Sequence, residues 1–152
     1  MNHVYLIGMR GVGKSTIGKI LAKKMGRHFI DLDNLLAERE AMSLPLLVEK
    51  KGWPYFRQQE GELLRETAAL DNLVVATGGG ILISPGHAAL LKATGRVILL
   101  TASIPKLQKR LETNVGRPSI TGKPFLQELE EIWEQRKEQY QSSADMTFSS
   151  DN

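Results

Sequence analysis

One short stretch decides the fold of this chain: Gly8-Met9-Arg10-Gly11-Val12-Gly13-Lys14-Ser15-Thr16, which fits the pattern G-x-x-x-x-G-K-[S/T]. It follows an apolar run at residues 4–7, which is typical of a buried strand. It precedes apolar residues at helical spacing, namely Ile17, Ile20, Leu21 and Met25. The glycines allow positive φ, so that successive backbone N–H groups can surround an anion. The stretch predicts a phosphate-binding loop between a strand and a helix; a glycine-rich turn without a ligand is the alternative.

Two side chains of this loop carry the chemistry of nucleotide binding. The Lys14 ammonium can reach the β- and γ-phosphates, and the Ser15 hydroxyl is placed to coordinate a Mg²⁺ ion that bridges them. The helix that starts here directs the positive end of its dipole toward the same anion. We therefore expect the loop to bind a nucleotide.

Composition limits the remaining possibilities. The 152 residues, 41% hydrophobic and 24% charged, are typical of one soluble globular domain, and we expect a single domain over residues 1–152. The absence of cysteine excludes disulfides and Cys-based zinc sites. No apolar run approaches the roughly 18 residues of a membrane span, and no signal peptide is evident. With a net charge of only +3, we expect a cytoplasmic monomer that binds neither membranes nor nucleic acid.

A second strand is predicted at residues 28–33, and its end carries Asp31 and Asp33. Residues two apart in a strand share a face, and ligands gather at the carboxyl ends of parallel strands, so both carboxylates should lie beside the phosphate loop. One could help to hold Mg²⁺ while the other accepts a hydroxyl proton. The alternative is that Asp33 only caps the helix predicted at residues 34–40.

Residues 34–70 are helical by pattern, with breaks expected at Pro45, Gly52 and Pro54, and carry no strand signal. So much helix between two strands predicts an inserted lobe that would clamp a substrate over the sheet. Within it Arg57 and Glu60 are spaced i and i+3, so they can pair. A pair exposed on the surface is the alternative.

A third strand at residues 73–77 runs into Gly78, Gly79 and Gly80. Consecutive glycines are entropically costly, so we expect the backbone here to approach a ligand closely; a mobile turn is the alternative. Further strands are predicted at residues 96–100 and 146–149. The alternation of strands and helices predicts an α/β fold with a parallel sheet covered by helices on both faces.

Two regions near the C-terminal end contain arginines of interest. Residues 114–124 are polar and rich in Gly and Pro, so we expect a lid from which Arg117 closes onto the transferred phosphate, or else disorder without function. In the last helix Arg136 shares an apolar stripe with Leu129, Trp133 and Tyr140. A guanidinium is costly to bury unpaired, so Arg136 needs an anionic partner, either a ligand or a structural carboxylate.

Taken together, these motifs resemble those of the shikimate kinases, small P-loop kinases akin to nucleoside monophosphate kinases. The resemblance spans the chain and rests on the phosphate loop, Asp31 and Asp33, F-R-x-x-E at residues 56–60, the glycine triplet, R-x-x-x-x-x-x-R-P at residues 110–118 and R-x-x-x-Y at residues 136–140. It implies a three-layer α/β/α fold with a five-stranded parallel sheet of the P-loop kinase type. It also implies a substrate-binding lobe at residues 33–60 and a lid at residues 113–124.

The resemblance further implies a role for individual residues. Those expected to bind ATP are Gly11, Val12, Gly13, Lys14, Ser15, Thr16, Arg110, which would stack near adenine, and Arg117. Ser15, and Asp31 through water, would hold Mg²⁺. Those expected to bind shikimate are Asp33, Arg57, Glu60, Gly78, Gly79, Gly80 and Arg136. Lys14, Asp33 and Arg117 would be catalytic, and Glu60 would orient Arg57.

The implied reaction is the ATP-dependent phosphorylation of the 3-hydroxyl of shikimate, in aromatic amino-acid biosynthesis. The alternatives are a kinase of the same fold for another hydroxy acid such as gluconate, and a nucleotide-binding regulatory module without turnover. Members of this family usually continue through an adenine-contacting loop and a closing helix, whereas this sequence stops at Asn152. We therefore expect weaker nucleotide binding than the full family architecture allows.

Overall fold

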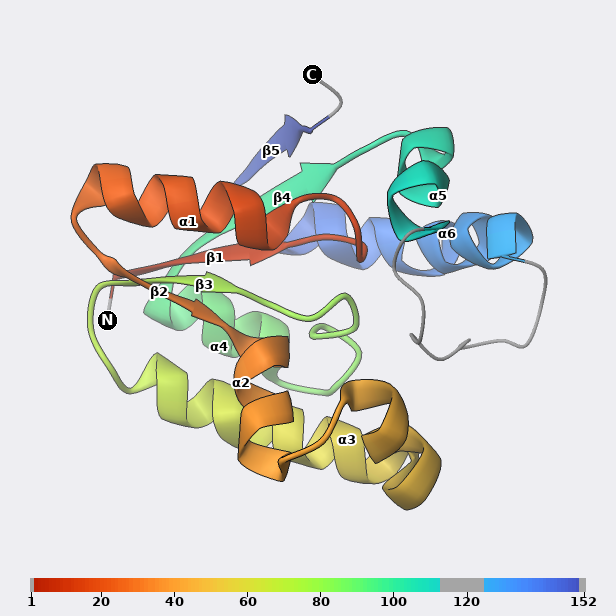
Figure 1. The fold of residues 1–152 in the computed structure, drawn as a ribbon. Coiled ribbons are helices and arrows are strands. Elements are labelled where there is room, and N and C mark those ends of the chain that lie inside the picture. The colour runs from red at the N-terminus through yellow and green to blue at the C-terminus, as the bar shows by residue number, and fades with distance from the viewer. Residues whose placement is uncertain (1, 113–124, 151–152) are drawn as a thin grey trace.

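Helices and strands alternate along the chain (Figure 1). The structure, a computed structural model, describes residues 2–112 and 125–150. The expected lid with Arg117 and the C-terminal residues Asp151 and Asn152 therefore lie outside the described residues. The described elements are β1 (His3–Ile7), α1 (Lys14–Met25), β2 (His28–Asp31), α2 (Leu32–Glu40), α3 (Leu44–Ala68), β3 (Leu73–Ala76), α4 (His87–Thr94), β4 (Gly95–Thr101), α5 (Ile104–Glu112), α6 (Phe125–Ser143) and β5 (Met146–Ser149).

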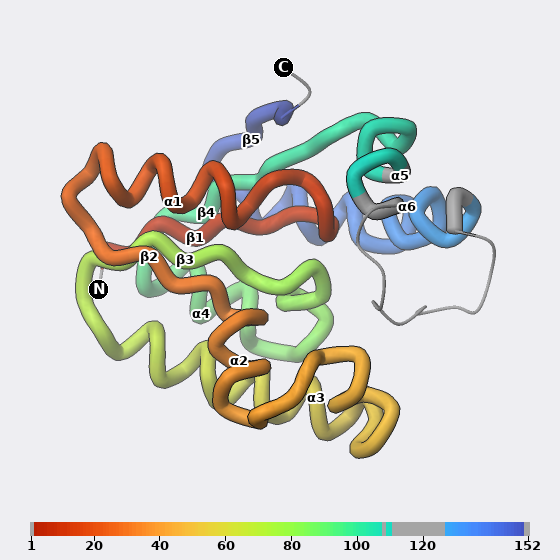
Figure 2. The backbone as a smooth tube through the Cα atoms, viewed as in Figure 1, coloured from red at the N-terminus to blue at the C-terminus, as the bar shows by residue number. Residues whose placement is uncertain are grey.

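The five strands form one parallel sheet in the order β2-β3-β1-β4-β5. The connection from β1 to β2 runs in one direction across the sheet, and the later connections run in the opposite direction. Because such crossovers are right-handed, α1 lies on one face while α3, α4 and α6 lie on the other, as the backbone tube also shows (Figure 2). The predicted three-layer α/β/α architecture is confirmed.

The strand order determines at which edge of the sheet a ligand site is expected. The central strand β1 lies between β3 and β4, so the chain leaves its carboxyl end in one direction and leaves β3 in the other. Ligands of open α/β sheets bind at such a switch point. Leu6 pairs with Ala76, and the Thr77 backbone N–H donates to the Leu6 carbonyl at 3.1 Å. The phosphate loop after β1 and the glycine triplet after β3 are thus neighbours.

Small residues bring α1 close to the sheet. A Cβ added at Gly18 would lie 2.4 Å from the Phe29 ring, and Ala22, one turn later, is also buried. Because Gly18 and Ala22 make the contact between α1 and the sheet, the larger apolar residues of α1 lie beside this contact or point away from it. The predicted helix is confirmed, but two of the apolar residues at helical spacing, Ile20 and Met25, are 54% and 40% exposed rather than buried against the sheet.

The boundary between β2 and α2 also differs from the prediction. The strand ends at Asp31, and the Asp31 side chain caps α2 by accepting from the Asn34 backbone N–H at 3.1 Å. Asp33 therefore lies in the first turn of α2, so both its placement in the strand and the alternative that it is the cap were wrong. The cap is two residues earlier because the Asp31 backbone is extended while that of Leu32 is already helical.

The predicted helical insertion forms α2 and α3. Pro45 does not break α3 but lies in its first turn, where a missing backbone N–H is tolerated. The break occurs at Gly52, whose φ of 86° and ψ of 166° separate two helical halves, two residues before Pro54. None of the helices within residues 2–112 and 125–150 is long and apolar enough to cross a membrane.

Candidate active site

The phosphate loop adopts the conformation that its glycines predict. Gly8, Gly11 and Gly13 have φ of 142°, 85° and 102°, and Gly13 precedes the first residue of α1. The Lys14 ammonium is buried and donates to the Gly8 carbonyl and, at 3.2 Å, to the Met9 carbonyl. The ammonium is thereby held inside the loop, at the positive end of the α1 dipole. This is the conformation in which the loop N–H groups and the α1 dipole can bind an anion.

Ser15 and Asp31 lie together at the edge of this loop. The Ser15 hydroxyl donates to Asp31 Oδ2, while Asp31 Oδ1 accepts from the Asn34 backbone N–H. A hydroxyl and a carboxylate oxygen side by side are ligands that suit a hard cation such as Mg²⁺, which usually takes its other ligands from water and substrate phosphates. Within the described part of the chain no three His, Cys, Asp or Glu side chains are grouped as metal ligands.

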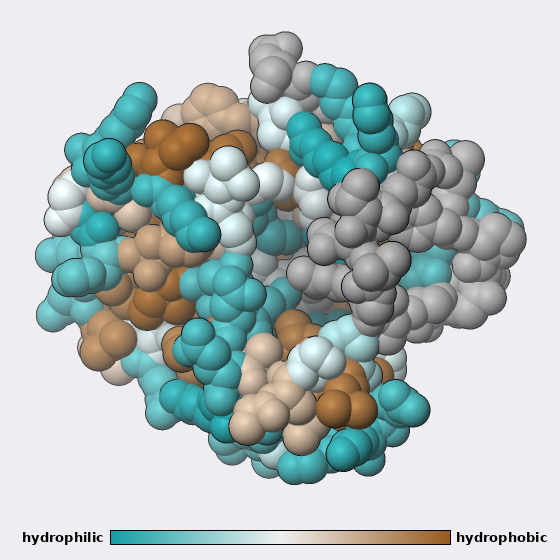
Figure 3. Space-filling view, viewed as in Figure 1, coloured by the Kyte–Doolittle hydropathy of each residue, from teal (hydrophilic) through white to brown (hydrophobic). Residues whose placement is uncertain are grey.

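A polar pocket surrounds the phosphate loop. It is lined by Arg10, Gly11, Val12, Gly13, Lys14, Ser15, Thr16, Ile17, Asp31, Asp33, Asn34, Thr77, Gly79, Arg110 and Ser150. The Arg110 guanidinium donates to the Gly11 carbonyl at 3.0 Å and to the Ser150 carbonyl at 2.9 Å. Arg110 thus ties α5 to the phosphate loop and to the segment after β5. The space-filling view shows the hollow on this face of the molecule (Figure 3).

A second pocket adjoins the first and is apolar on much of its wall. Its apolar residues are Met9, Leu44, Val48, Trp53, Phe56, Leu129 and Ile132. Its polar residues are Arg10, Asp33, Arg57, Glu60, Arg136 and the glycine triplet. Arg10, Asp33 and Gly79 line both pockets, so the two spaces meet at these residues. All the described residues predicted to bind shikimate line this second pocket.

Arg57 and Glu60 form an ion pair at 3.1 Å on α3. Glu60 is 3% exposed and Arg57 19%, so the alternative of an exposed surface pair was wrong. Burial raises the pKa of the Glu60 carboxyl, and the adjacent Arg57 guanidinium opposes that rise. The guanidinium also lies 5.2 Å from the Trp53 ring and 5.3 Å from the Phe56 ring, close enough for cation–π attraction.

The glycine triplet leaves room for these side chains. A Cβ on Gly80 would lie 2.5–2.7 Å from the Arg57 guanidinium, and one on Gly78 would lie 2.8 Å from Asp33 Oδ1 and 3.0 Å from Glu60 Oε2. At positions 78 and 80 the space that a Cβ would occupy is thus taken by the ends of the protein's own polar side chains, which would have to shift to admit one. Gly79 is different: its Cβ would have only ordinary contacts, and it faces both pockets.

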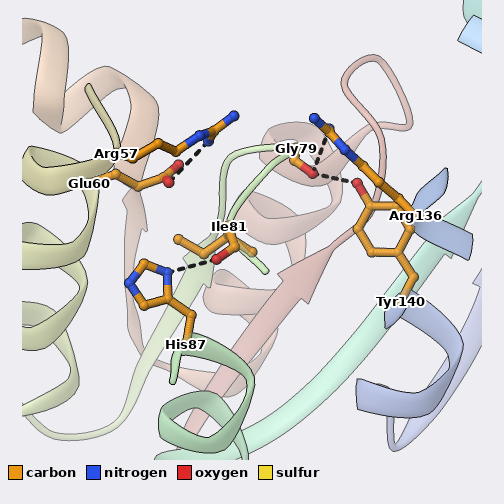
Figure 4. A network of polar contacts seen from close by, with 7 residues as sticks. All are labelled: Arg57, Glu60, Gly79, Ile81, His87, Arg136 and Tyr140. Carbon is orange, nitrogen blue, oxygen red and sulfur yellow. Dashed lines mark hydrogen bonds and ion pairs between the residues drawn. The ribbon is translucent and has the colours of Figure 1, made fainter. Parts of the chain in front are cut away.

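Arg136 and Tyr140 reach the same turn from α6 (Figure 4). Arg136 Nη1 donates to the Gly79 carbonyl at 3.1 Å, and the Tyr140 hydroxyl donates to the same oxygen. Burial raises the pKa of the Tyr140 hydroxyl, against the effect of nearby Arg136, so the hydroxyl remains a donor. Among the described residues no carboxylate lies within ion-pair distance of Arg136. A carbonyl, rather than a structural carboxylate, holds this guanidinium at the pocket.

Sequence reasoning missed Arg10 as a site residue. Arg10 occupies one of the positions that the loop motif leaves open, so the motif does not indicate that an arginine there has a role in the site. In the structure its Nη2 donates to Glu128 Oε1 at 3.4 Å, and Glu128 is 2% exposed on α6. The packing of α6 against the loop, which brings these residues together, is a tertiary contact between residues 118 positions apart.

The comparison with known families agrees with this geometry. A protein-family model described as Shikimate kinase matches residues 10–152. The chain belongs to the shikimate kinase family. A curated family member, shikimate kinase 2 of Sodalis glossinidius, is 38% identical over 145 residues, which cover 93% of this chain and 83% of that protein.

Solved structures of the family superpose closely on this one. The shikimate kinase from Acinetobacter baumannii in complex with shikimate has a TM-score of 0.93 at 30% identity, covering 97% of this chain and 83% of that one. A gluconokinase from Sinorhizobium meliloti has a TM-score of 0.54 at 15% identity, covering 99% of this chain and 83% of that one. That second likeness extends to the fold alone.

Proposed function

We propose that this chain transfers the γ-phosphoryl group of ATP to the 3-hydroxyl of shikimate, yielding shikimate 3-phosphate and ADP. The observation that carries the proposal is the junction of the two pockets. An acceptor pocket that contains Arg57 and Arg136 meets the phosphate loop at Asp33, Arg10 and Gly79. The similar enzyme from Acinetobacter baumannii is in complex with shikimate, which supports this choice of acceptor.

On the donor side, the residues at 11–16 would bind the ATP phosphates. The loop N–H groups and the α1 dipole would hold the anion, while the buried Lys14 ammonium neutralises charge between the β- and γ-phosphates. Arg110, which already lies at the loop, would contact the adenine side. Arg117 would approach the transferred phosphate from the lid. Catalysis of this kind depends mostly on positioning and electrostatic stabilisation.

The metal would be Mg²⁺, held by Ser15 and, through water, by Asp31. The two oxygen-bearing side chains already contact one another, which is the donor chemistry that the ion prefers. When bound, Mg²⁺ would neutralise negative charge on the β- and γ-phosphates.

On the acceptor side, Asp33 would orient the reacting hydroxyl and accept its proton, since it lines both pockets. Arg57 and Arg136 would bind the shikimate carboxylate from opposite walls, one on α3 and one on α6. Guanidinium groups can bind a carboxylate through two parallel N–H···O bonds. Glu60, buried behind Arg57, would fix its orientation, and Gly79 would leave space where the substrates meet.

A coupled assay of ADP formation tests the proposal directly. We expect ADP release with ATP, Mg²⁺ and shikimate together, far above the rate with gluconate or with no acceptor. Faster turnover with gluconate would favour the other hydroxy-acid kinase. Nucleotide binding without any increase in ADP release when an acceptor is added would favour a regulatory module.

We also propose that the protein works as a cytoplasmic monomer without a membrane or nucleic-acid partner. A monomeric mass in solution would support the proposed oligomeric state.

A further inference from the structure

Side chains from two helices hold the carbonyls of the turn at residues 78–83. From α6, Arg136 and Tyr140 donate to the Gly79 carbonyl, and Gln139 Nε2 donates to the Leu82 carbonyl at 2.5 Å. From α4, His87 Nδ1 bonds to the Ile81 carbonyl at 2.7 Å (Figure 4). Since a carbonyl only accepts, the proton of that bond belongs to Nδ1. His87 is thus the part of α4 that fixes this turn.

The His87 ring is buried at the first residue of α4 and is 5% exposed. Its other edge faces α3: a Cβ added at Gly61 would lie 3.1 Å from His87 Nε2, 3.5 Å from Cε1 and 3.3 Å from Arg65 Nη1. Glycine inside a helix is destabilising relative to alanine. Here its missing side chain leaves the space that the imidazole occupies, between the turn and α3.

This space adjoins the acceptor pocket. Gly61 follows Glu60, the buried carboxylate that pairs with Arg57. On the other side of the imidazole, His87 holds the carbonyl of Ile81. Ile81 directly follows Gly80, and the backbone of Gly80 packs against the Arg57 guanidinium. The imidazole therefore lies between the two backbone segments that confine Arg57, without lining the pocket itself.

We propose that His87 is a positioning residue for acceptor binding. By bonding the Ile81 carbonyl and packing on Gly61, it sets the separation between α3 and the glycine turn. That separation determines where Arg57 lies relative to Arg136, which is held on the Gly79 carbonyl of the same turn. The inference rests on the proposed function, since it concerns the two arginines that would bind the carboxylate.

Two substitutions at His87 and one at Gly61 test it. His87→Leu keeps apolar bulk but removes the donor, whereas His87→Asn can place an amide N–H near the position of Nδ1. We expect His87→Leu to raise the KM for shikimate about 3- to 10-fold, the effect of one lost hydrogen bond, with little change in the KM for ATP. His87→Asn should keep the KM for shikimate within about 2-fold for the same reason.

Gly61→Ala adds a methyl group against the imidazole without touching the substrate or the hydrogen bond. Alanine favours a helix, so a purely structural role for this position predicts an equal or higher Tm with an unchanged KM. We expect the KM for shikimate to rise instead, since the ring must shift. Lys92→Met is the control on α4, because the Lys92 ammonium donates to the distant Ser142 carbonyl, at 2.9 Å, and its loss should leave every KM unchanged.

The outcomes separate this inference from the proposed function. If the unmodified chain phosphorylates shikimate, and the KM for shikimate is unchanged in both His87→Leu and Gly61→Ala whatever their Tm values, His87 has no positioning role. An equal rise in KM for His87→Leu and His87→Asn would likewise exclude the hydrogen bond as the cause. If the unmodified chain does not phosphorylate shikimate at all, the proposed function fails and the inference fails with it.

Discussion

Replacing Arg136 by lysine tests whether the last helix binds the acid group of the acceptor. Arg136→Lys keeps the positive charge but loses the planar fork that can form two parallel N–H···O bonds with a carboxylate. In the structure one guanidinium nitrogen is already bonded to the Gly79 carbonyl at 3.1 Å, so a single ammonium cannot serve both this oxygen and a carboxylate fork. We expect the substitution to weaken shikimate binding without removing activity.

The size of the effect follows from the bond that is lost. One hydrogen bond to a charged group contributes about 1.5–3 kcal/mol, which corresponds to roughly 10- to 150-fold in binding. The loss should appear as a raised KM for shikimate, while the KM for ATP changes little because Arg136 does not line the phosphate-loop pocket. Steady-state kinetics with each substrate varied in turn, together with Tm, measures all three quantities.

A matched control is available on α2. Arg39 pairs with Glu66 in an exposed ion pair, so Arg39→Lys should leave both KM values and Tm nearly unchanged. A lower Tm for Arg136→Lys with an unaltered KM for shikimate would show that Arg136 only braces the glycine turn. The proposal that α6 binds the acid would then have to be abandoned.

Three further predictions concern the remaining charged groups of the site. Lys14→Met should leave the protein folded but reduce kcat by about 10²- to 10³-fold, since a preorganised electrostatic contact is lost; near-normal kcat would refute the proposed role of the lysine. Asp33→Asn should reduce kcat by about 10²-fold or more while nucleotide affinity, measured by titration, is retained; a change in Tm alone would make Asp33 structural. Burial raises the pKa of Glu60 above 4.5, so the folded protein binds this proton more tightly than the unfolded chain does, and the contribution of Glu60 to stability is greatest below pH 4.5 and declines as the pH rises through the raised pKa. The Tm of Glu60→Gln relative to the unmodified chain should therefore increase from about pH 4 to pH 7, and a difference independent of pH would contradict this.

The sequence alone determined the parts of this protein whose physics is local. The phosphate loop was predictable because three glycines, a lysine and a hydroxyl at fixed spacing can serve few purposes between a strand and a helix. The strands β3 and β4 were predictable because a buried parallel strand reads as a continuous apolar run, here Leu73–Ala76 and residues 97–100. The pairing of Arg57 with Glu60 followed from their spacing on one helix.

The tertiary structure decided what depends on contacts between distant segments. Which aspartate caps α2 depends on a single backbone conformation at Asp31, which the residue types do not distinguish. The exposure of Ile20 follows from the close approach of Gly18 to Phe29, which no periodicity reveals. The glycine triplet was recognised as special, but only packing shows that Arg57, Asp33 and Glu60 fill the space beside Gly78 and Gly80. The roles of Arg10 and His87 depend on contacts with other segments. Arg10 bonds to Glu128 on α6, and the His87 ring packs beside Gly61 on α3, so neither role can be read from the local sequence.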